Sequence, residues 1–407
     1  MIVYLLAMFS DWLQGPYVYQ LYVSYGFTAY EICLLFVGGF GSSLVFGTFI
    51  GSLADKYGRK KMCLLYSACY IIACLTKTVN DFNILMIGRV LCGISTSLLF
   101  SAFESWMVCE HAKRGFDPML LSETFSYCTF GNGLAAVIAG LTANVISEKY
   151  GFTAPFVLAI LPLSICGFLV SSQWAENYGE ARADVGTSGL QQGLSVIMKD
   201  KKIAALGLAQ SCFEAAMYIF VFLWTPALKS SEEEAAERAQ ESTKGGTSSY
   251  LGVIFAVYMV CMMFGSSLYR IASDIYGQRG VRAAPLLMHA VALLAIGSCT
   301  MFYDSKAIVY CSFLVFEVCC GIFFPGYGVI KSAEIPEQVR SSVMNIFRIP
   351  VNLVVVLVLM QKGVHPQNIF GFCTGAHAIG LLCFYYYFKS AGGAGKEYKV
   401  LPTDDKV

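Results

Sequence analysis

Seven charged side chains stand inside long apolar runs of this 407-residue chain. A charge at the centre of a membrane-spanning helix costs about 2.5–3.5 kcal/mol, so such a residue normally faces a cavity or a partner. Arginine keeps its charge and offers five N–H donors in a planar fork, which suits an oxyanion. A carboxylate in the same position can carry a proton. The seven residues are Asp11, Arg89, Glu104, Glu123, Glu214, Glu317 and Arg348.

These charges have a purely structural alternative, in which they pair between helices and only hold a bundle together. Glu104 and Glu123 stand nearer the ends of their apolar runs, where water is within reach, and are the weaker candidates. The other five are therefore the candidate site residues.

The composition is that of a membrane protein. Hydrophobic residues make up 57% of the chain and charged residues 14%, against about 45–50% and 25% in soluble proteins. This composition excludes a soluble enzyme and a disordered chain, since too few charges are present to cover a water-facing surface. The net charge of +1 offers no basic surface for phosphate, which excludes a nucleic-acid partner. We expect no cofactor and no metal, because the 16 Cys residues lack the spacing of a ligand set.

Apolar runs long enough to cross about 30 Å of hydrocarbon as helices recur along the chain. The predicted fold class is therefore an all-α membrane protein with the lipid bilayer around it. The twelve predicted spans are 1–22, 31–53, 62–79, 83–109, 122–146, 154–173, 203–225, 250–271, 284–303, 307–330, 343–361 and 367–388. The predicted domains are an N-terminal six-helix half (1–173), a linker (174–202), a C-terminal six-helix half (203–388) and a tail (389–407).

Lys and Arg residues gather on one side of these spans. The even-numbered connections and the tail, with the span ends beside them, hold nineteen of the 28, and the odd-numbered side holds seven. The remaining two are Arg89 and Arg348, inside spans. Because positively charged loops stay in the cytoplasm, we predict a multi-pass protein of the cell membrane with both termini cytoplasmic.

The most specific short segment lies between the second and third spans. It reads Gly51-Ser52-Leu53-Ala54-Asp55-Lys56-Tyr57-Gly58-Arg59-Lys60. Its second glycine permits a tight turn, and its aspartate can pair with the arginine four residues on or with a neighbouring helix. The same Asp-x-x-Gly spacing recurs after the eighth span, at Asp274 and Gly277.

This segment and its repeat resemble the loop signature of the major facilitator superfamily. The resemblance implies two six-helix halves with a substrate site near the midplane, which work by rocking one half against the other. It also implies that the motif is a conformational latch, formed by Gly51, Asp55, Gly58, Arg59, Asp274 and Gly277. Spans one, four, seven and ten would line the cavity, and five of the seven charges lie on them: Asp11, Arg89, Glu104, Glu214 and Glu317.

Five further blocks, spread from the first to the eleventh span, resemble the molybdate-anion transporter family. They are 11–17 (DWLQGPY), 99–106 (LFSAFESW), 222–226 (FLWTP), 265–270 (GSSLYR) and 345–350 (NIFRIP). Members of that family commonly carry a further apolar segment before the first span, whereas this chain opens on 1–6 (MIVYLL).

The resemblance implies that the chain takes up molybdate, a tetrahedral dianion. Arg89 and Arg348, one in each half, would bind it, because two cations balance a dianion. Asp11, Glu214 or Glu317 would carry a coupling proton. We expect a monomer.

Two alternatives stay open from the sequence alone. The first is a proton-linked carrier of a neutral solute such as a sugar, in which the arginines only pair with carboxylates. The second is a membrane sensor that binds its ligand without moving it. An enzyme is not expected, since no nucleophile–base motif or paired His/Glu motif is visible.

Overall fold

The computed structural model describes residues 1–116, 118–178, 187–229, 250–336, 340–361 and 365–391. Within these ranges the chain is almost wholly helical and contains no strand, which confirms the all-α prediction. Its residues fall into two compact units. Unit 1 comprises Met1–Ala183 and Lys229–Val257, and unit 2 comprises Asp184–Leu228 and Tyr258–Val407.

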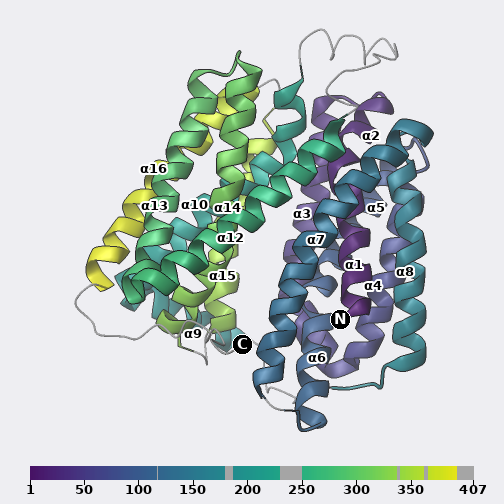
Figure 1. Cartoon of the computed structure of the whole chain (residues 1–407), viewed down its shortest axis with the longest axis horizontal. Helices are drawn as coiled ribbons and strands as arrows, with labels where there is room; N and C mark the ends of the chain where they lie inside the picture. Colours follow the sequence, from purple (N-terminus) through teal and green to yellow (C-terminus); the bar gives the residue numbers. More distant parts are fainter. Residues whose placement is uncertain (117, 179–186, 230–249, 337–339, 362–364, 392–407) are drawn as a thin grey trace. The chain divides into compact units, whose positions relative to one another are not determined.

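Unit 1 contains the first six predicted spans (Figure 1). Its helices are α1 (Ile2–Gln14), the 3-10 helix η1 (Gly15–Tyr17), α2 (Val18–Ser24), α3 (Ala29–Tyr57), α4 (Arg59–Thr76), α5 (Phe82–Leu99), α6 (Ala102–Lys113), α7 (Pro118–Tyr150) and α8 (Ala154–Gln173). In this unit α1 packs against α7 and α8, α3 packs against α5, and α4 packs against α5 and α8. The candidate residues Asp11 and Arg89 lie on α1 and α5.

Two of the spans in unit 1 are interrupted. The first breaks at η1, where Pro16 has no backbone N–H to donate to the turn before it. The fourth breaks at Phe100 and Ser101, which separate α5 from α6. Discontinuous spans of this kind are tolerated in a membrane where neighbouring protein supplies the missing hydrogen bonds.

Unit 2 contains the remaining spans and a helix of the linker. Its helices are α9 (Thr187–Lys199), α10 (Lys201–Leu228), α13 (Gln278–Met301), α14 (Lys306–Glu334), α15 (Arg340–Leu359) and α16 (Pro366–Ala391), together with most of α12 (Leu251–Tyr276). Here α16 packs against α10 and α13, α13 also packs against α14, and α15 packs against α9 and α10. The ends of all twelve predicted spans lie within six residues of helix ends in the structure.

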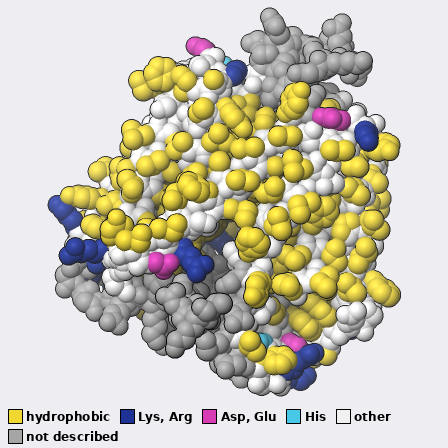
Figure 2. All heavy atoms as spheres, viewed as in Figure 1, with side chains coloured by type: hydrophobic (Ala, Val, Ile, Leu, Met, Phe, Trp, Pro, Cys, Tyr) yellow, Lys and Arg dark blue, Asp and Glu magenta, His cyan; other side chains and the backbone are white. Residues whose placement is uncertain are grey.

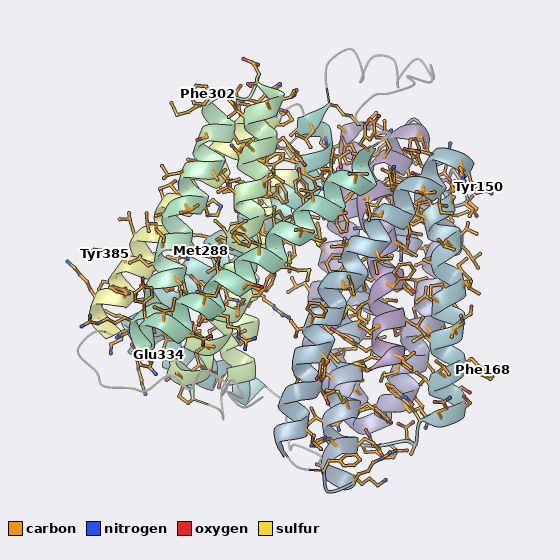
Figure 3. All side chains as sticks on the ribbon, viewed as in Figure 1. Tyr150, Phe168, Met288, Phe302, Glu334 and Tyr385 are labelled. Atoms are coloured by element: carbon orange, nitrogen blue, oxygen red, sulfur yellow. The ribbon has the colours of Figure 1, made fainter. Side chains whose placement is uncertain are left out.

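The outer faces of the helices are apolar. Within the described ranges, nine helices are long and apolar enough to cross a membrane. Large side chains point outward from them, including Phe168 (69% exposed), Leu294 (70%) and Leu382 (69%); Figure 3 shows Phe168 directed away from α8. Figure 2 shows hydrophobic side chains spread over the visible face and charged ones near helix ends. Apolar surface of this extent is expected against lipid and not against water.

Candidate substrate site

Arg89, in unit 1, extends from α5 toward α3. Its Nε donates to the backbone oxygen of Leu35 at 3.1 Å, and its guanidinium carbon lies 4.7 Å from the centre of the Phe36 ring. Gly39 makes room for it, because a Cβ at that position would fall 2.6 Å from Nη2. Within the described part of the chain Arg89 has no carboxylate partner, so both Nη groups remain available as donors to an anion.

Asp11 is held by a different helix. The Tyr70 hydroxyl, from α4, donates to its carboxylate. One turn away, Tyr66 donates to the backbone oxygen of Ala7 at 3.0 Å, so two tyrosines of α4 bind consecutive turns of α1. Asp11 and Arg89, the two candidate site residues of unit 1, do not pair with each other among the described contacts, since each has another partner.

Unit 2 brings Glu214 together with two cations. Glu214, on α10, accepts a hydrogen bond from Gln210 Nε2 at 2.9 Å. The positive charges that act on its carboxylate are those of Lys331 on α14 and Arg348 on α15. The charges of Glu214 and Arg348 also act on the hydroxyl of Tyr218, which lies one turn further along α10. Two basic side chains and one carboxylate, from three helices, therefore act on one another in unit 2.

Glu317 does not belong to that cluster. It lies on the same helix as Lys331 but fourteen residues earlier, which is about 21 Å along the axis at 1.5 Å per residue. It is 5% exposed, and its Oε2 has no hydrogen-bond partner in the described part of the structure. Glu317 is therefore a buried acid that lies apart from Lys331.

The motif between the second and third spans forms a sharp turn. Gly58 ends α3 and begins α4 with φ +106°, and Gly277 has φ +53° at the start of α13. Positive φ angles favour glycine, so each copy of the motif turns at a residue that side chains would disfavour. Asp274 lies 3.9 Å from Arg270 on the exposed end of α12. Two other motif residues lie on α3, but their side chains fall outside the described ones: Gly51 and Asp55.

Glu176, just after α8, caps the helix that follows this turn. Its carboxylate accepts from the backbone N–H of Lys60 at 2.8 Å and of Lys61 at 3.3 Å. Those N–H groups lie in the first turn of α4, where no intrahelical acceptor exists. Arg59 extends from the same turn and donates through Nη1 to the backbone oxygen of Ser105 at 3.1 Å.

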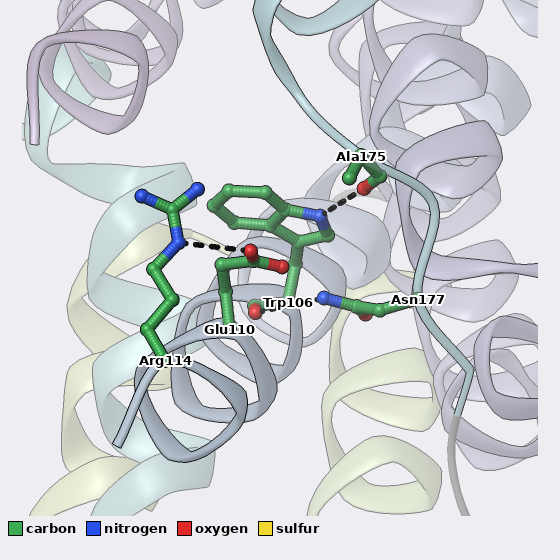
Figure 4. Close-up of polar contacts among 5 residues, drawn as sticks. All are labelled: Trp106, Glu110, Arg114, Ala175 and Asn177. Atoms are coloured by element: carbon green, nitrogen blue, oxygen red, sulfur yellow. Dashed lines mark hydrogen bonds and ion pairs between the residues drawn. The ribbon is translucent and has the colours of Figure 1, made fainter. Parts of the chain in front are cut away.

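The residues beside Glu176 bind α6 as well (Figure 4). Trp106 Nε1 donates to the backbone oxygen of Ala175 at 2.8 Å, and Asn177 Nδ2 donates to the backbone oxygen of Trp106 at 3.2 Å. The Trp106 ring stacks on Trp174 with 3.6 Å between centroids. The segment 174–177 is therefore a strap that joins the start of α4 to α6.

The sequence selects five candidate site residues, and neither Lys331 nor the strap is among them. The five are Arg89, Arg348, Asp11, Glu214 and Glu317. Lys331 stands directly after the tenth predicted span (307–330), where a basic residue is expected to set orientation. The structure continues α14 to Glu334, which places Lys331 inside the helix. No motif marks Glu176, because capping from a distant segment leaves no local pattern.

Comparisons with known proteins agree with this architecture. Residues 1–321 match the MFS_5 family model, described as sugar transporters with twelve transmembrane segments. The molybdate-anion transporter of Xenopus laevis is 34% identical over 95% of this chain and 84% of its own length, and that of Takifugu rubripes is 34% identical over 91% and 82%.

Solved structures with this fold are also transporters. A mutant of the nucleoside transporter NupG superposes with a TM-score of 0.74 at 12% identity, covering 95% of this chain and 99% of that one. A D-xylose-proton symporter gives 0.65 at 13%, covering 95% and 96%. At these identities the likeness concerns the fold. From the sequence relatives and the family model, the chain is a multi-pass membrane transport protein that belongs to the molybdate-anion transporter family of the major facilitator superfamily.

Proposed function

We propose that this chain is a secondary active transporter that takes up molybdate by alternating access, coupled to protons. The observation that carries the proposal is an arginine inside a span, Arg89, that keeps both Nη groups available in a chain related to molybdate-anion transporters. In unit 2, Lys331 and Arg348 are the basic residues whose charges act on Glu214. Each unit thus supplies cationic groups suited to a tetrahedral dianion.

The supporting geometry favours an anion over a neutral solute at Arg89. An arginine that served only to neutralise a carboxylate would lie in an ion pair with it, and such pairs are frequently bidentate. Arg89 instead binds a backbone oxygen and the face of an aromatic ring, which position its guanidinium without neutralising it. A fixed, unneutralised guanidinium is a preorganised anion site.

Molybdate uptake by cells that express Arg89→Lys or Arg348→Lys tests the proposal. Lysine keeps the charge but loses the planar fork, so we expect each variant to reduce uptake at low molybdate concentration by about tenfold or more. Arg114→Lys is the matched control, because Arg114 is 57% exposed and pairs with Glu110 four residues away. Unimpaired uptake in both site variants would contradict the proposal.

We assign the coupling proton to Asp11, Glu214 or Glu317, each of which lies inside a span and is buried or half-buried. Proteoliposomes with an imposed pH gradient separate them. A single Asp→Asn or Glu→Gln variant that keeps molybdate exchange but no longer responds to the gradient identifies the carrier. If all three variants respond as the unmodified protein does, none of these carboxylates carries the proton.

The charge bias of the loops supports a cell-membrane protein with both termini in the cytoplasm. Epitope tags at each end, probed with and without permeabilising the cells, test the orientation. Tags at both ends that antibody reaches only after permeabilisation are the expected result. We expect the protein to act as a monomer, because each unit already supplies cationic groups of its own.

A proton-linked carrier of a neutral solute is the second candidate, because the matching family model is described as sugar transporters. Competition separates the two functions. Tungstate, another tetrahedral dianion, should inhibit molybdate uptake, whereas sugars should not. Inhibition by sugars with indifference to tungstate would favour the second candidate. Binding of molybdate without movement into proteoliposomes would instead indicate a sensor.

A further inference from the structure

The linker helix α9 is held against unit 2 by one of its faces. Val196 and Ile197 pack on a buried hydrophobic cluster that joins the start of α10 to the start of α15. Figure 1 shows α9 at one end of unit 2, and α10 and α15 are the helices that it packs against. The cluster consists of Ile203, Ile335, Val343 and Phe347.

A second apolar face of α9 is exposed. Leu194 is 51% exposed and Met198 is 77% exposed. Consecutive residues of a helix point about 100° apart, so these two side chains, four residues apart, lie only about 40° from each other. The direction midway between them is about 130° from the direction midway between Val196 and Ile197. The two exposed side chains therefore form a face of their own, separate from the packed one.

The junction between α9 and α10 places this face at the membrane surface. A single residue, Asp200, separates the two helices, and α10 is long and apolar enough to cross a membrane. The junction is also hydrogen-bonded, because the N–H of Asp200 donates to the oxygen of Val196 at 3.0 Å and its carboxylate accepts from the N–H of Lys202 at 2.8 Å. Helix α9 therefore lies where α10 enters the bilayer.

Basic side chains stand beside the exposed apolar pair. Lys199 ends α9 and Lys201 begins α10, and both are exposed. With Lys202, three lysines and one aspartate occupy the four residues 199–202. A helix with exposed apolar side chains and lysines beside them is typical of helices that lie on a membrane surface and are attracted to anionic lipids. The cytoplasmic leaflet is the one that carries such lipids.

We propose that the exposed face of α9, together with Lys199 and Lys201, docks on anionic phospholipids of the cytoplasmic leaflet. Leu194 and Met198 enter the boundary between headgroups and acyl chains, and the two ammonium groups meet the acidic headgroups. This inference goes beyond the proposed function and does not depend on the transported solute. It uses only the cytoplasmic position that the charge bias gives to the linker.

Photochemical crosslinking of the full chain tests the docking surface. Met198→benzoylphenylalanine is reconstituted into vesicles with equal amounts of phosphatidylcholine and phosphatidylserine, and the crosslinked lipids are identified by mass spectrometry. We expect phosphatidylserine adducts to exceed phosphatidylcholine adducts about fivefold or more, because each lysine near an anionic surface contributes about fivefold. Both leaflets of these vesicles have the same composition, so the result does not depend on the orientation of the protein.

Met301→benzoylphenylalanine is the matched control for exposure. Met301 is 76% exposed at the end of α13, and the charged residues that follow it, Asp304 and Lys306, have opposite charges. Its crosslinks should therefore go to both lipids in proportion to their amounts. If a photoreactive residue at 198 prevents insertion into the membrane, Leu194→benzoylphenylalanine replaces it with the same expectation.

Removal of the lysines tests the charge contribution. Lys199→Gln combined with Lys201→Gln should lower the excess of phosphatidylserine adducts at residue 198 about fivefold or more. Lys61→Gln combined with Lys113→Gln is the control, because it removes the same total charge from exposed lysines of unit 1. This second pair should leave the excess unchanged.

Three results would overturn the docking surface. The first is equal crosslinking of the two lipids at residue 198, and the second is an excess that survives removal of both lysines. The third is crosslinking mainly to protein, which would assign the face to another part of this chain or to a second copy. None of these results bears on molybdate uptake, so the proposed function is tested separately.

Discussion

A single methyl group at Gly39 should displace Arg89 without altering the arginine itself. In the structure a Cβ at this position would lie 2.6 Å from Nη2 and 2.9 Å from both Cζ and Nε of Arg89. Ordinary van der Waals contacts are about 3.5–4.0 Å, so Gly39→Ala must push the guanidinium by about 1 Å. The bond from Nε to Leu35, 3.1 Å long in the structure, would then be lost or bent.

The size of the effect follows from what this bond does. A hydrogen bond to a charged group contributes about 1.5–3 kcal/mol, and a misplacement of about 1 Å at a binding group can reduce activity about a hundredfold. We therefore expect KM for molybdate to rise by about ten- to a hundredfold in Gly39→Ala, measured by initial rates of labelled molybdate uptake.

Gly41→Ala, two residues along the same helix, is the matched control. A Cβ there meets nothing within 4 Å, and alanine in a helix interior is favoured over glycine by about 0.5–1 kcal/mol. Gly41→Ala should therefore unfold at a slightly higher temperature and keep the KM of the unmodified protein. If Gly39→Ala is folded and has the same KM as Gly41→Ala, then the position of Arg89 does not determine binding and the reasoning is wrong.

Two further predictions concern the helix contacts of unit 1. Glu176→Ala removes the cap from the first turn of α4. The free energy of unfolding should fall by about 0.5–2 kcal/mol, and the thermal unfolding midpoint should fall with it. An unchanged midpoint would show that water caps the turn equally well. Tyr70→Phe leaves the Asp11 carboxylate without its tyrosine donor, at a cost of about 1–3 kcal/mol. Tyr66→Phe should lower the unfolding midpoint less than Tyr70→Phe does, because the backbone oxygen of Ala7 loses only a second hydrogen bond. Equal falls in the two midpoints would contradict this ranking.

The sequence by itself determined the spans, the repeated motif and the family. A helix that crosses a bilayer must present about twenty apolar residues, whatever lies beside it, so the length of each run marks a span. Turn chemistry is similarly local, because Gly58 and Gly277 adopt angles that side chains disfavour. Both properties depend only on residues that are close together in the sequence.

Tertiary structure decided which charges meet. Arg89 binds the backbone oxygen of Leu35, and the charge of Lys331, at the end of its predicted span, acts on Glu214. Lys77, at the end of the third predicted span, is buried against Tyr22. Such partners depend on how helices are rotated about their axes, and consecutive residues of a helix point about 100° apart. Only the packed helices therefore show which faces meet, and hence where a cation keeps its donors for an anion.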